Sequence, residues 1–209
     1  MEHTVKLQPS ISFTDLLRGK FKNILDPIGS FLNGLGITPN MMTMLGLFGN
    51  LLAAILLASG KMIGGGVIVL LMGPFDAIDG TMARLRGTPS RFGGVLDSVI
   101  DRYSELVIIG GLLVYFTRQE NWIVVIVCYL AAAGSLLVSY TRARAESAKF
   151  SVKGGLFTRV ERYIVITIGL LINQPVIALW VIALLANFTA IQRMILVYKQ
   201  AAEQGDIIK

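Results

Sequence analysis

The 209-residue sequence has one cysteine, one histidine and few charged residues. Because Cys128 is alone, an intrachain disulfide is excluded, and its place in an apolar stretch predicts an inert, buried side chain. His3 lies in the polar N-terminal segment, where we do not expect a catalytic role. Only 15% of the residues are charged, and several long stretches have no charge at all. Such a composition is rare in a soluble domain of this length.

Hydrophobic residues make up 54% of the chain, and the mean hydropathy is +0.68. The uncharged stretch 163–192 is too long for one span of about 20 residues, and the polar "NQP" at 173–175 divides it. Because the first thirty residues are polar and mixed, we expect no cleavable signal peptide. The sequence therefore predicts an all-α polytopic membrane protein with six transmembrane helices, near residues 41–59, 62–83, 94–116, 121–144, 157–173 and 176–198.

The net charge of +6 is unevenly distributed. If the spans alternate, the only basic residues on one side of the membrane are Lys61 and Arg118. The opposite side collects Lys6, Arg18, Lys20, Lys22, Arg84, Arg86, Arg91, Arg142, Arg144, Lys149, Lys153, Arg159, Arg162, Arg193, Lys199 and Lys209. The positive-inside rule then places both termini and the basic loops on the cytoplasmic side of the cell membrane. This excess suits anionic headgroups and phosphate-bearing substrates, and it does not indicate nucleic acid.

Residues 11–33 mix apolar and basic residues at helical spacing. This pattern predicts an N-terminal amphipathic helix lying in the membrane interface, with an apolar face made by Phe13, Leu16, Leu17, Phe21 and Ile24. The alternative is an amphipathic helix packed on the cytoplasmic ends of the spans. We expect a single domain over residues 1–209, with an N-terminal segment (1–38), a six-helix core (39–199) and a short polar tail (200–209).

Four aspartates stand out in this apolar chain. Asp76 and Asp79 are three residues apart, and Asp97 and Asp101 are four apart, so each pair shares a helix face. The two pairs lie at the same ends of neighbouring antiparallel spans, and they can converge on one spot. Because such a cluster repels itself in a low dielectric, a positive group must lie there. Four carboxylates suit Mg²⁺, Mn²⁺ or Ca²⁺, and they can hold two divalent ions for displacement at phosphorus.

Small residues and an arginine accompany the acids. Gly80 follows Asp79 directly, and a missing side chain there lets a phosphate or a flat base approach the backbone. Arg84 can offer a forked donor to a phosphate oxygen. The pattern as a whole, from Asp76 to Asp101, reads D-x-x-D-G-x-x-A-R-x8-G-x3-D-x3-D.

This motif resembles the signature of the CDP-alcohol phosphotransferase family at every fixed position. The resemblance implies a metal-dependent enzyme that transfers a phosphatidyl or phospho-alcohol group from a CDP-linked donor, such as CDP-diacylglycerol, to an acceptor hydroxyl and releases CMP. It implies two Mg²⁺ ions, or Mn²⁺, held by Asp76, Asp79 and Asp97, with Asp101 as a further ligand and as the base on the acceptor hydroxyl. It also implies a homodimer. The implied contacts to the CDP-lipid are Asn40, Thr43, Gly80, Arg84 and Ser90.

The basic segment from 139 to 163 bears on the acceptor. "SYTRARAE" and "RVER" resemble the phosphatidylinositol-phosphate synthase branch, whose acceptor is inositol 1-phosphate. The resemblance implies that the acceptor phosphate is bound by Ser139, Arg142, Arg162 and Arg193, with Arg142 standing where a lysine is expected. Glycerol 3-phosphate, which would give phosphatidylglycerol phosphate, is the alternative acceptor. A CDP-lipid donor with ether-linked tails is a further alternative, because no feature of the sequence distinguishes ether-linked from ester-linked tails.

A cation or proton transporter that uses the four acids is the alternative of a different class. A transporter places its acids near mid-membrane with broken helices around them, whereas these acids cluster near one interface beside arginines. A non-catalytic scaffold gives no reason for the spacing. Both comparisons favour the enzyme.

Overall fold

The computed structural model describes residues 13–87, 90–152 and 155–206, and it describes side chains from Asn23 onward. Within these ranges the protein is all-helical, as predicted, with seven α-helices and no strand. The helices are α1 (Phe13–Gly34), α2 (Pro39–Ala58), α3 (Met62–Leu85), α4 (Arg91–Arg118), α5 (Trp122–Ser147), α6 (Arg159–Leu171) and α7 (Pro175–Glu203).

Local sequence signals set several of the helix ends near the acidic cluster. Thr38 caps α2, with its side chain accepting a hydrogen bond from the Met41 amide at 3.3 Å, and Pro39 follows at the first helical position. Ser90 caps α4 in the same way, accepting from the Gly93 amide at 2.9 Å. These caps fix where α2 and α4 begin, which is the end of the bundle that carries the acids.

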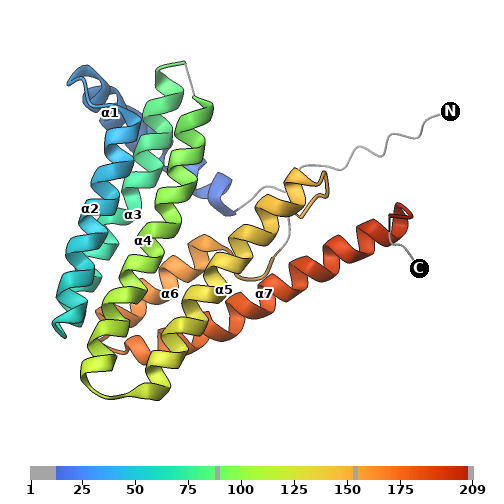
Figure 1. Cartoon of the computed structure of the whole chain (residues 1–209). Coiled ribbons are helices and arrows are strands. Elements are labelled where there is room, and N and C mark those ends of the chain that lie inside the picture. Colours follow the sequence, from blue (N-terminus) through green and yellow to red (C-terminus); the bar gives the residue numbers. More distant parts are fainter. Residues whose placement is uncertain (1–12, 88–89, 153–154, 207–209) are drawn as a thin grey trace.

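The helices run back and forth between two ends of the molecule (Figure 1). The turns α2–α3, α4–α5 and α6–α7 lie at one end, and the α3–α4 and α5–α6 connections lie at the other. The α2 helix packs against α3 and α4, and α5 packs against α7. The α3–α6 and α4–α5 contacts join these two halves. The two halves therefore meet where α3, α4 and α6 come together.

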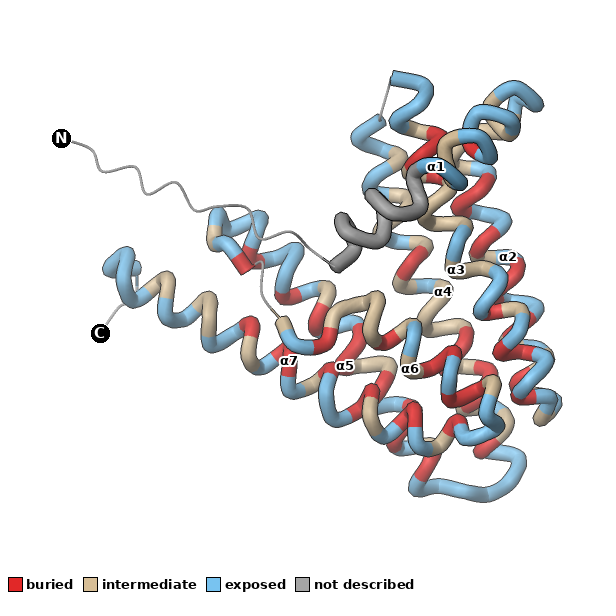
Figure 2. Tube along the Cα trace, turned by 180° about the vertical axis from the view of Figure 1, so that it is seen from behind, coloured by how far each residue is buried: buried red, intermediate tan, exposed pale blue. Residues whose placement is uncertain are grey.

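Tight packing brings α4 onto α2. A Cβ placed on Gly111 would lie 2.5 Å from the backbone oxygen of Ala54, so only glycine permits this approach. The buried residues line the contacts between helices, while much of the outer surface is exposed (Figure 2). Many exposed side chains are large and apolar, such as Phe48, Ile55, Leu71 and Ile123. This surface suits lipid as its surroundings.

Four helices are long and apolar enough to cross a membrane: α2, α3, α5 and α7. They correspond to four of the six predicted spans. The other two do not meet this description, because α4 carries Asp97, Asp101, Arg102 and Glu105 near its start and α6 has only 13 residues. The six-span count therefore stays a prediction.

Several sequence predictions fall on residues that the structure does not describe. The α1 helix is present, but the side chains of Phe13, Leu16, Leu17 and Phe21 lie outside the described residues, so its predicted apolar face stays a prediction. His3 and part of the predicted basic side lie there too, namely Lys6, Arg18, Lys20, Lys22, Lys153 and Lys209. At the other end, α7 continues past the predicted boundary at residue 199 to Glu203.

Candidate active site

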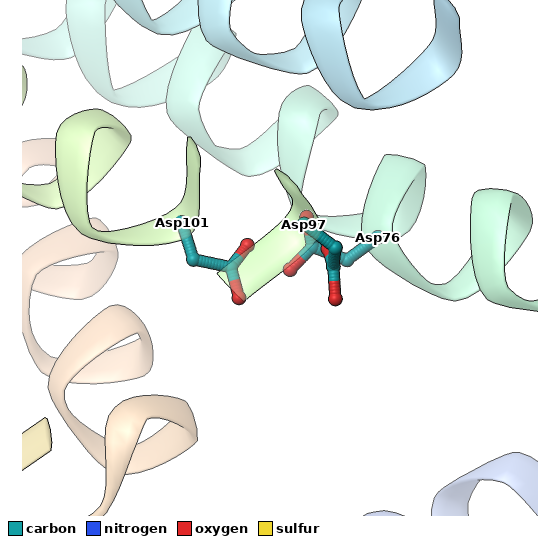
Figure 3. Close-up of side chains that lie close together, drawn as sticks. All are labelled: Asp76, Asp97 and Asp101. Atoms are coloured by element: carbon teal, nitrogen blue, oxygen red, sulfur yellow. The ribbon is translucent and has the colours of Figure 1, made fainter. Parts of the chain in front are cut away.

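Three of the four predicted aspartates come together between α3 and α4. Asp76 on α3 and Asp97 and Asp101 on α4 each present a carboxylate oxygen within 4.8 Å of the others. Their side chains point into the same space (Figure 3). The four-residue spacing places Asp97 and Asp101 on one face of α4, and the packing of both α3 and α4 against α2 brings Asp76 near them. Oxygen ligands in this number and proximity fit a hard divalent cation.

Arg159, the first residue of α6, supplies positive charge to this cluster. Its Nη2 lies 2.5 Å from Oδ2 of Asp76, and its Nη1 lies 2.5 Å from Oδ2 of Asp101. The sequence indicated that a positive group must lie among the acids, but Arg159 was not among the predicted site residues. Its only sequence signal is its place at the start of the fifth predicted span, three residues before Arg162.

Asp79 is held apart from the other three acids by a hydrogen bond to α2. It is buried, and its Oδ2 accepts a hydrogen bond of 2.7 Å from the hydroxyl of Thr43 on α2. Among the described residues it does not join the group made by Asp76, Asp97 and Asp101. The structure thus ties two predicted residues, Asp79 and Thr43, directly to each other.

The acids border a cavity of about 510 Å³ that has two chemical ends. Its charged residues are Asp76, Asp97, Asp101, Glu105 and Arg159. Apolar residues line the rest, among them Leu47, Leu70, Ile108, Ile109, Ile166 and Ile182. A cavity of this kind suits a molecule with a charged head and an apolar body.

Comparison with known proteins gives the family. A model of CDP-alcohol phosphatidyltransferases matches residues 36–197, which is more than half of the chain. The chain belongs to the CDP-alcohol phosphatidyltransferase family. It is therefore a metal-dependent phosphotransferase and an integral membrane protein, as the sequence predicted.

Curated relatives agree with this assignment. The archaetidylinositol phosphate synthase of Pyrococcus horikoshii is 39% identical over 179 residues, which cover 85% of this chain and 93% of that protein. The phosphatidylinositol phosphate synthase of Mycobacteroides abscessus is 35% identical over 190 residues, covering 86% of each chain.

Solved structures of a Mycobacterium tuberculosis phosphatidylinositol phosphate synthase share the fold. The structure with bound CDP-DAG has a TM-score of 0.80 and 32% identity, and it covers 84% of this chain and 94% of that one. A second structure of that protein, in complex with manganese and citrate, has a TM-score of 0.79 and 31% identity, with 83% and 88% covered.

The predicted donor contacts lie near the start of α2, the end of α3 and the start of α4. Asn40 opens α2, and its Oδ1 would lie 3.4 Å from a Cβ placed on Gly93, so the starts of α2 and α4 are close together. Arg84 is exposed and donates from Nη2 to the Thr81 hydroxyl at 2.8 Å. Gly80 has open space beside it, with only Arg84 within 4 Å of an added Cβ. The Ser90 hydroxyl is engaged in capping α4.

The predicted acceptor residues of the phosphatidyltransferase lie on α5, α6 and α7. Ser139 and Arg142 line a groove of about 630 Å³ between α4 and α5, together with Arg102. Arg142 is exposed and pairs with Glu146 at 2.9 Å. Arg193 is buried on α7 and donates from Nη1 to the carbonyl oxygen of Val138 at 2.6 Å. The two arginines therefore differ sharply in exposure.

Arg162 is the most buried of these arginines, at 1% exposure. Its Nε and Nη2 donate to the two carboxylate oxygens of Glu105 at 2.6 and 2.9 Å. Its third nitrogen, Nη1, is buried and has no hydrogen-bond partner in the part of the chain that the structure describes. Glu105 was not among the predicted site residues, although it is the only acid between 103 and 117.

Proposed function

We propose that this protein transfers the phosphatidyl group of CDP-diacylglycerol to inositol 1-phosphate, forming phosphatidylinositol phosphate and CMP. The observation that carries the proposal is the cluster of Asp76, Asp97 and Asp101 in the wall of a cavity that is largely lined by apolar residues. A CDP-linked lipid has a pyrophosphate beside two long tails, which matches this division. Relatives named for inositol phosphate acceptors support the choice of acceptor.

We propose that the carboxylates hold two Mg²⁺ ions, with Mn²⁺ as the alternative. Asp76, Asp97 and Asp101 supply ligands from their clustered oxygens, and Asp79 completes the predicted set. The relative solved with manganese supports a divalent metal at this site. Divalent ions bound there would neutralise charge on the attacked phosphoryl group and on the leaving phosphate.

In the proposed reaction, the acceptor hydroxyl oxygen forms a bond to the phosphorus of the phosphatidyl group. The bond from that phosphorus to the oxygen bridging to CMP breaks, and CMP leaves with the electron pair. Asp101 takes the proton of the attacking hydroxyl, as a carboxylate within hydrogen-bond reach can do. Asp101 is suited to this role because it is buried at the cavity wall. The donor is positioned by Asn40, Thr43, Gly80, Arg84 and Ser90, which lie on the adjoining ends of α2, α3 and α4.

We assign the acceptor phosphate to Ser139, Arg142, Arg162 and Arg193. Ser139 and Arg142 border an open groove, so they can contact a solute directly. Arg162 is buried, and the unpaired Nη1 of its guanidinium supports a role in donating a hydrogen bond to one more oxygen. Charge-assisted hydrogen bonds from guanidinium groups are well suited to phosphate.

We place the protein in the cell membrane with six spans, counting α4 and α6, and with both termini on the cytoplasmic side. The acids lie at the end that also carries the α3–α4 and α5–α6 connections, where basic residues are numerous. The α1 helix would lie in the interface on the same side. A homodimer is proposed from the resemblance to the family alone.

The test is CMP release from CDP-diacylglycerol by the purified protein with Mg²⁺. Inositol 1-phosphate, glycerol 3-phosphate, free inositol and serine are compared as acceptors. CMP with inositol 1-phosphate alone is the expected result. CMP with glycerol 3-phosphate alone would overturn the acceptor assignment, and no CMP with any acceptor would overturn the proposed reaction. A parallel series with an ether-linked CDP-lipid distinguishes the donor tails, because one relative is named for an archaetidyl lipid.

A further inference from the structure

Arg159 pairs with two of the three carboxylates that a divalent ion would use. Its two terminal nitrogens contact Oδ2 of Asp76 and Oδ2 of Asp101 at 2.5 Å each. These two carboxylates, with Asp97, form the group whose oxygens lie within 4.8 Å of one another. The guanidinium therefore bridges α3 and α4 from the start of α6.

A guanidinium and a divalent ion held by the same carboxylates would lie close together. An ion bound at about 2.0–2.2 Å from the carboxylates would lie within a few ångströms of the guanidinium nitrogens. At that separation, in a half-buried site, the repulsion between the two positive groups is large. The two cations are therefore alternative partners of the same carboxylates.

We propose that Arg159 is a resident counter-ion of the metal site: a divalent ion displaces it from Asp76 and Asp101, and it then pairs with the pyrophosphate of the donor. This inference rests on the proposed function and concerns the same site. It explains how three carboxylates can face one another before a metal arrives. It also gives the displaced guanidinium a new anionic partner at the moment when the substrate brings one.

The position of Arg159 allows this exchange. The residue begins α6, and its side chain is 37% exposed, so the guanidinium can turn without moving the helix. The helix itself is held in place next to it. Glu161 accepts a hydrogen bond from the Thr158 amide at 2.8 Å in a capping box, and the Tyr163 hydroxyl donates to the Val69 carbonyl of α3.

The neighbouring acid cannot take over as the new partner. Glu105 lines the same cavity, but both of its oxygens are engaged by Arg162. The phosphate oxygens of the donor would then be the anionic partner of the displaced Arg159 guanidinium. Arg162 itself is buried and paired outside the cluster, so it does not compete with the metal in this way.

The test measures Mn²⁺ binding by the purified full-length protein, without lipid substrate, from the electron paramagnetic resonance signal of free Mn²⁺. The variant is Arg159→Gln, and the matched control is Arg118→Gln, which removes the same charge at the other end of α4. We expect Arg159→Gln to bind Mn²⁺ about tenfold more tightly than the parent, since it removes a positive charge paired with the partly exposed Asp76 and the buried Asp101. The control should bind as the parent does.

Two further measurements make the result specific. Arg159→Lys keeps a positive charge, so its Mn²⁺ affinity should stay close to that of the parent. The Michaelis constant for CDP-diacylglycerol should rise about tenfold in Arg159→Gln, because the pyrophosphate loses a forked donor.

An unchanged or weaker Mn²⁺ affinity in Arg159→Gln would overturn the inference while leaving the proposed function intact. Equal tightening in the lysine variant would also overturn it, because charge would then not be the cause. If neither the parent nor the variant binds Mn²⁺, the metal site itself is refuted, and the inference with it.

Discussion

The acidic cluster and the candidate acceptor residues differ in how closely their side chains are grouped. Asp76, Asp97 and Asp101 lie on two adjoining helices and share one small space. Ser139, Arg142, Arg162 and Arg193 are distributed over three helices. Two of these four are buried and already have protein partners. The acids therefore form one preformed site, whereas the arginines serve both the fold and a ligand, and substitutions in the two regions should have different consequences.

Removal of a cluster carboxylate should have the largest effect. In Asp76→Ala the metal site loses a ligand, so we expect kcat/KM for CMP release to fall by about 10⁴-fold or more. Metal-dependent binding of CDP-diacylglycerol should be lost as well. The control is Asp206→Ala, an exposed acid beyond the end of α7, which should behave as the parent. Unchanged titration of Asp76→Ala by the CDP-lipid would remove Asp76 from the metal site.

A subtler change in the same region separates binding from chemistry. Asp101→Asn keeps the shape of the side chain but removes the proposed base, so we expect kcat to fall by about 10²–10⁴-fold. Donor and metal binding should be partly retained, because Asp76 and Asp97 keep their carboxylates. Steady-state kinetics and Mn²⁺ binding are measured on the same preparation. A variant that turned over at the parental rate would show that another group accepts the proton.

These two regions also differ in how much of them the sequence could predict. The acids follow from helical spacing within two neighbouring helices, which is local information, and three of the four meet as predicted. Asp79 does not join them, because its carboxylate accepts a hydrogen bond from the hydroxyl of Thr43 on α2. A hydrogen bond between residues 36 positions apart depends on how the helices pack, and no local pattern encodes it.

The arginines depend on contacts between distant segments. Arg162 is separated by 57 residues from Glu105, and Arg193 by 55 residues from Val138. Sequence reasoning gave Arg159 no role of its own, because only the packing of α6 against α3 and α4 brings it to the cluster. The helical fold and its class were predictable from apolar runs, while pairings of this kind were not.

Breaking the buried pair between Arg162 and Glu105 should have an intermediate effect. It should lower the free energy of unfolding and also weaken the enzymatic activity. Glu105→Gln leaves the Arg162 charge buried without a counter-ion. Because Glu105 is 18% exposed, we expect a loss of about 2 kcal/mol, less than for a fully buried pair. The midpoint of thermal unfolding in detergent should fall by about 5 °C.

The acceptor dependence of Arg162→Ala shows which role dominates. If Arg162 contacts the acceptor phosphate, the Arg162→Ala substitution should raise the Michaelis constant most for inositol 1-phosphate. An equal loss with every acceptor would mean that Arg162 acts through the fold alone. In that case the double replacement Glu105→Leu with Arg162→Met should recover stability, because an apolar pair avoids the desolvation of both charges.

The smallest effect on stability, and the most selective effect on function, should come from Arg142→Ala. Arg142 is exposed and pairs only with Glu146, so its removal should change the free energy of unfolding by less than about 0.5 kcal/mol. The Michaelis constant for inositol 1-phosphate should nevertheless rise about tenfold, with kcat and the donor's Michaelis constant unchanged. The matched control is Arg144→Ala, an exposed arginine two positions along α5 that does not line the groove. If both variants raise the Michaelis constant for inositol 1-phosphate, or if neither does, the groove between α4 and α5 is not the acceptor site. Selective weakening of acceptor binding by Arg142→Ala would instead show that the groove between α4 and α5 binds the acceptor phosphate.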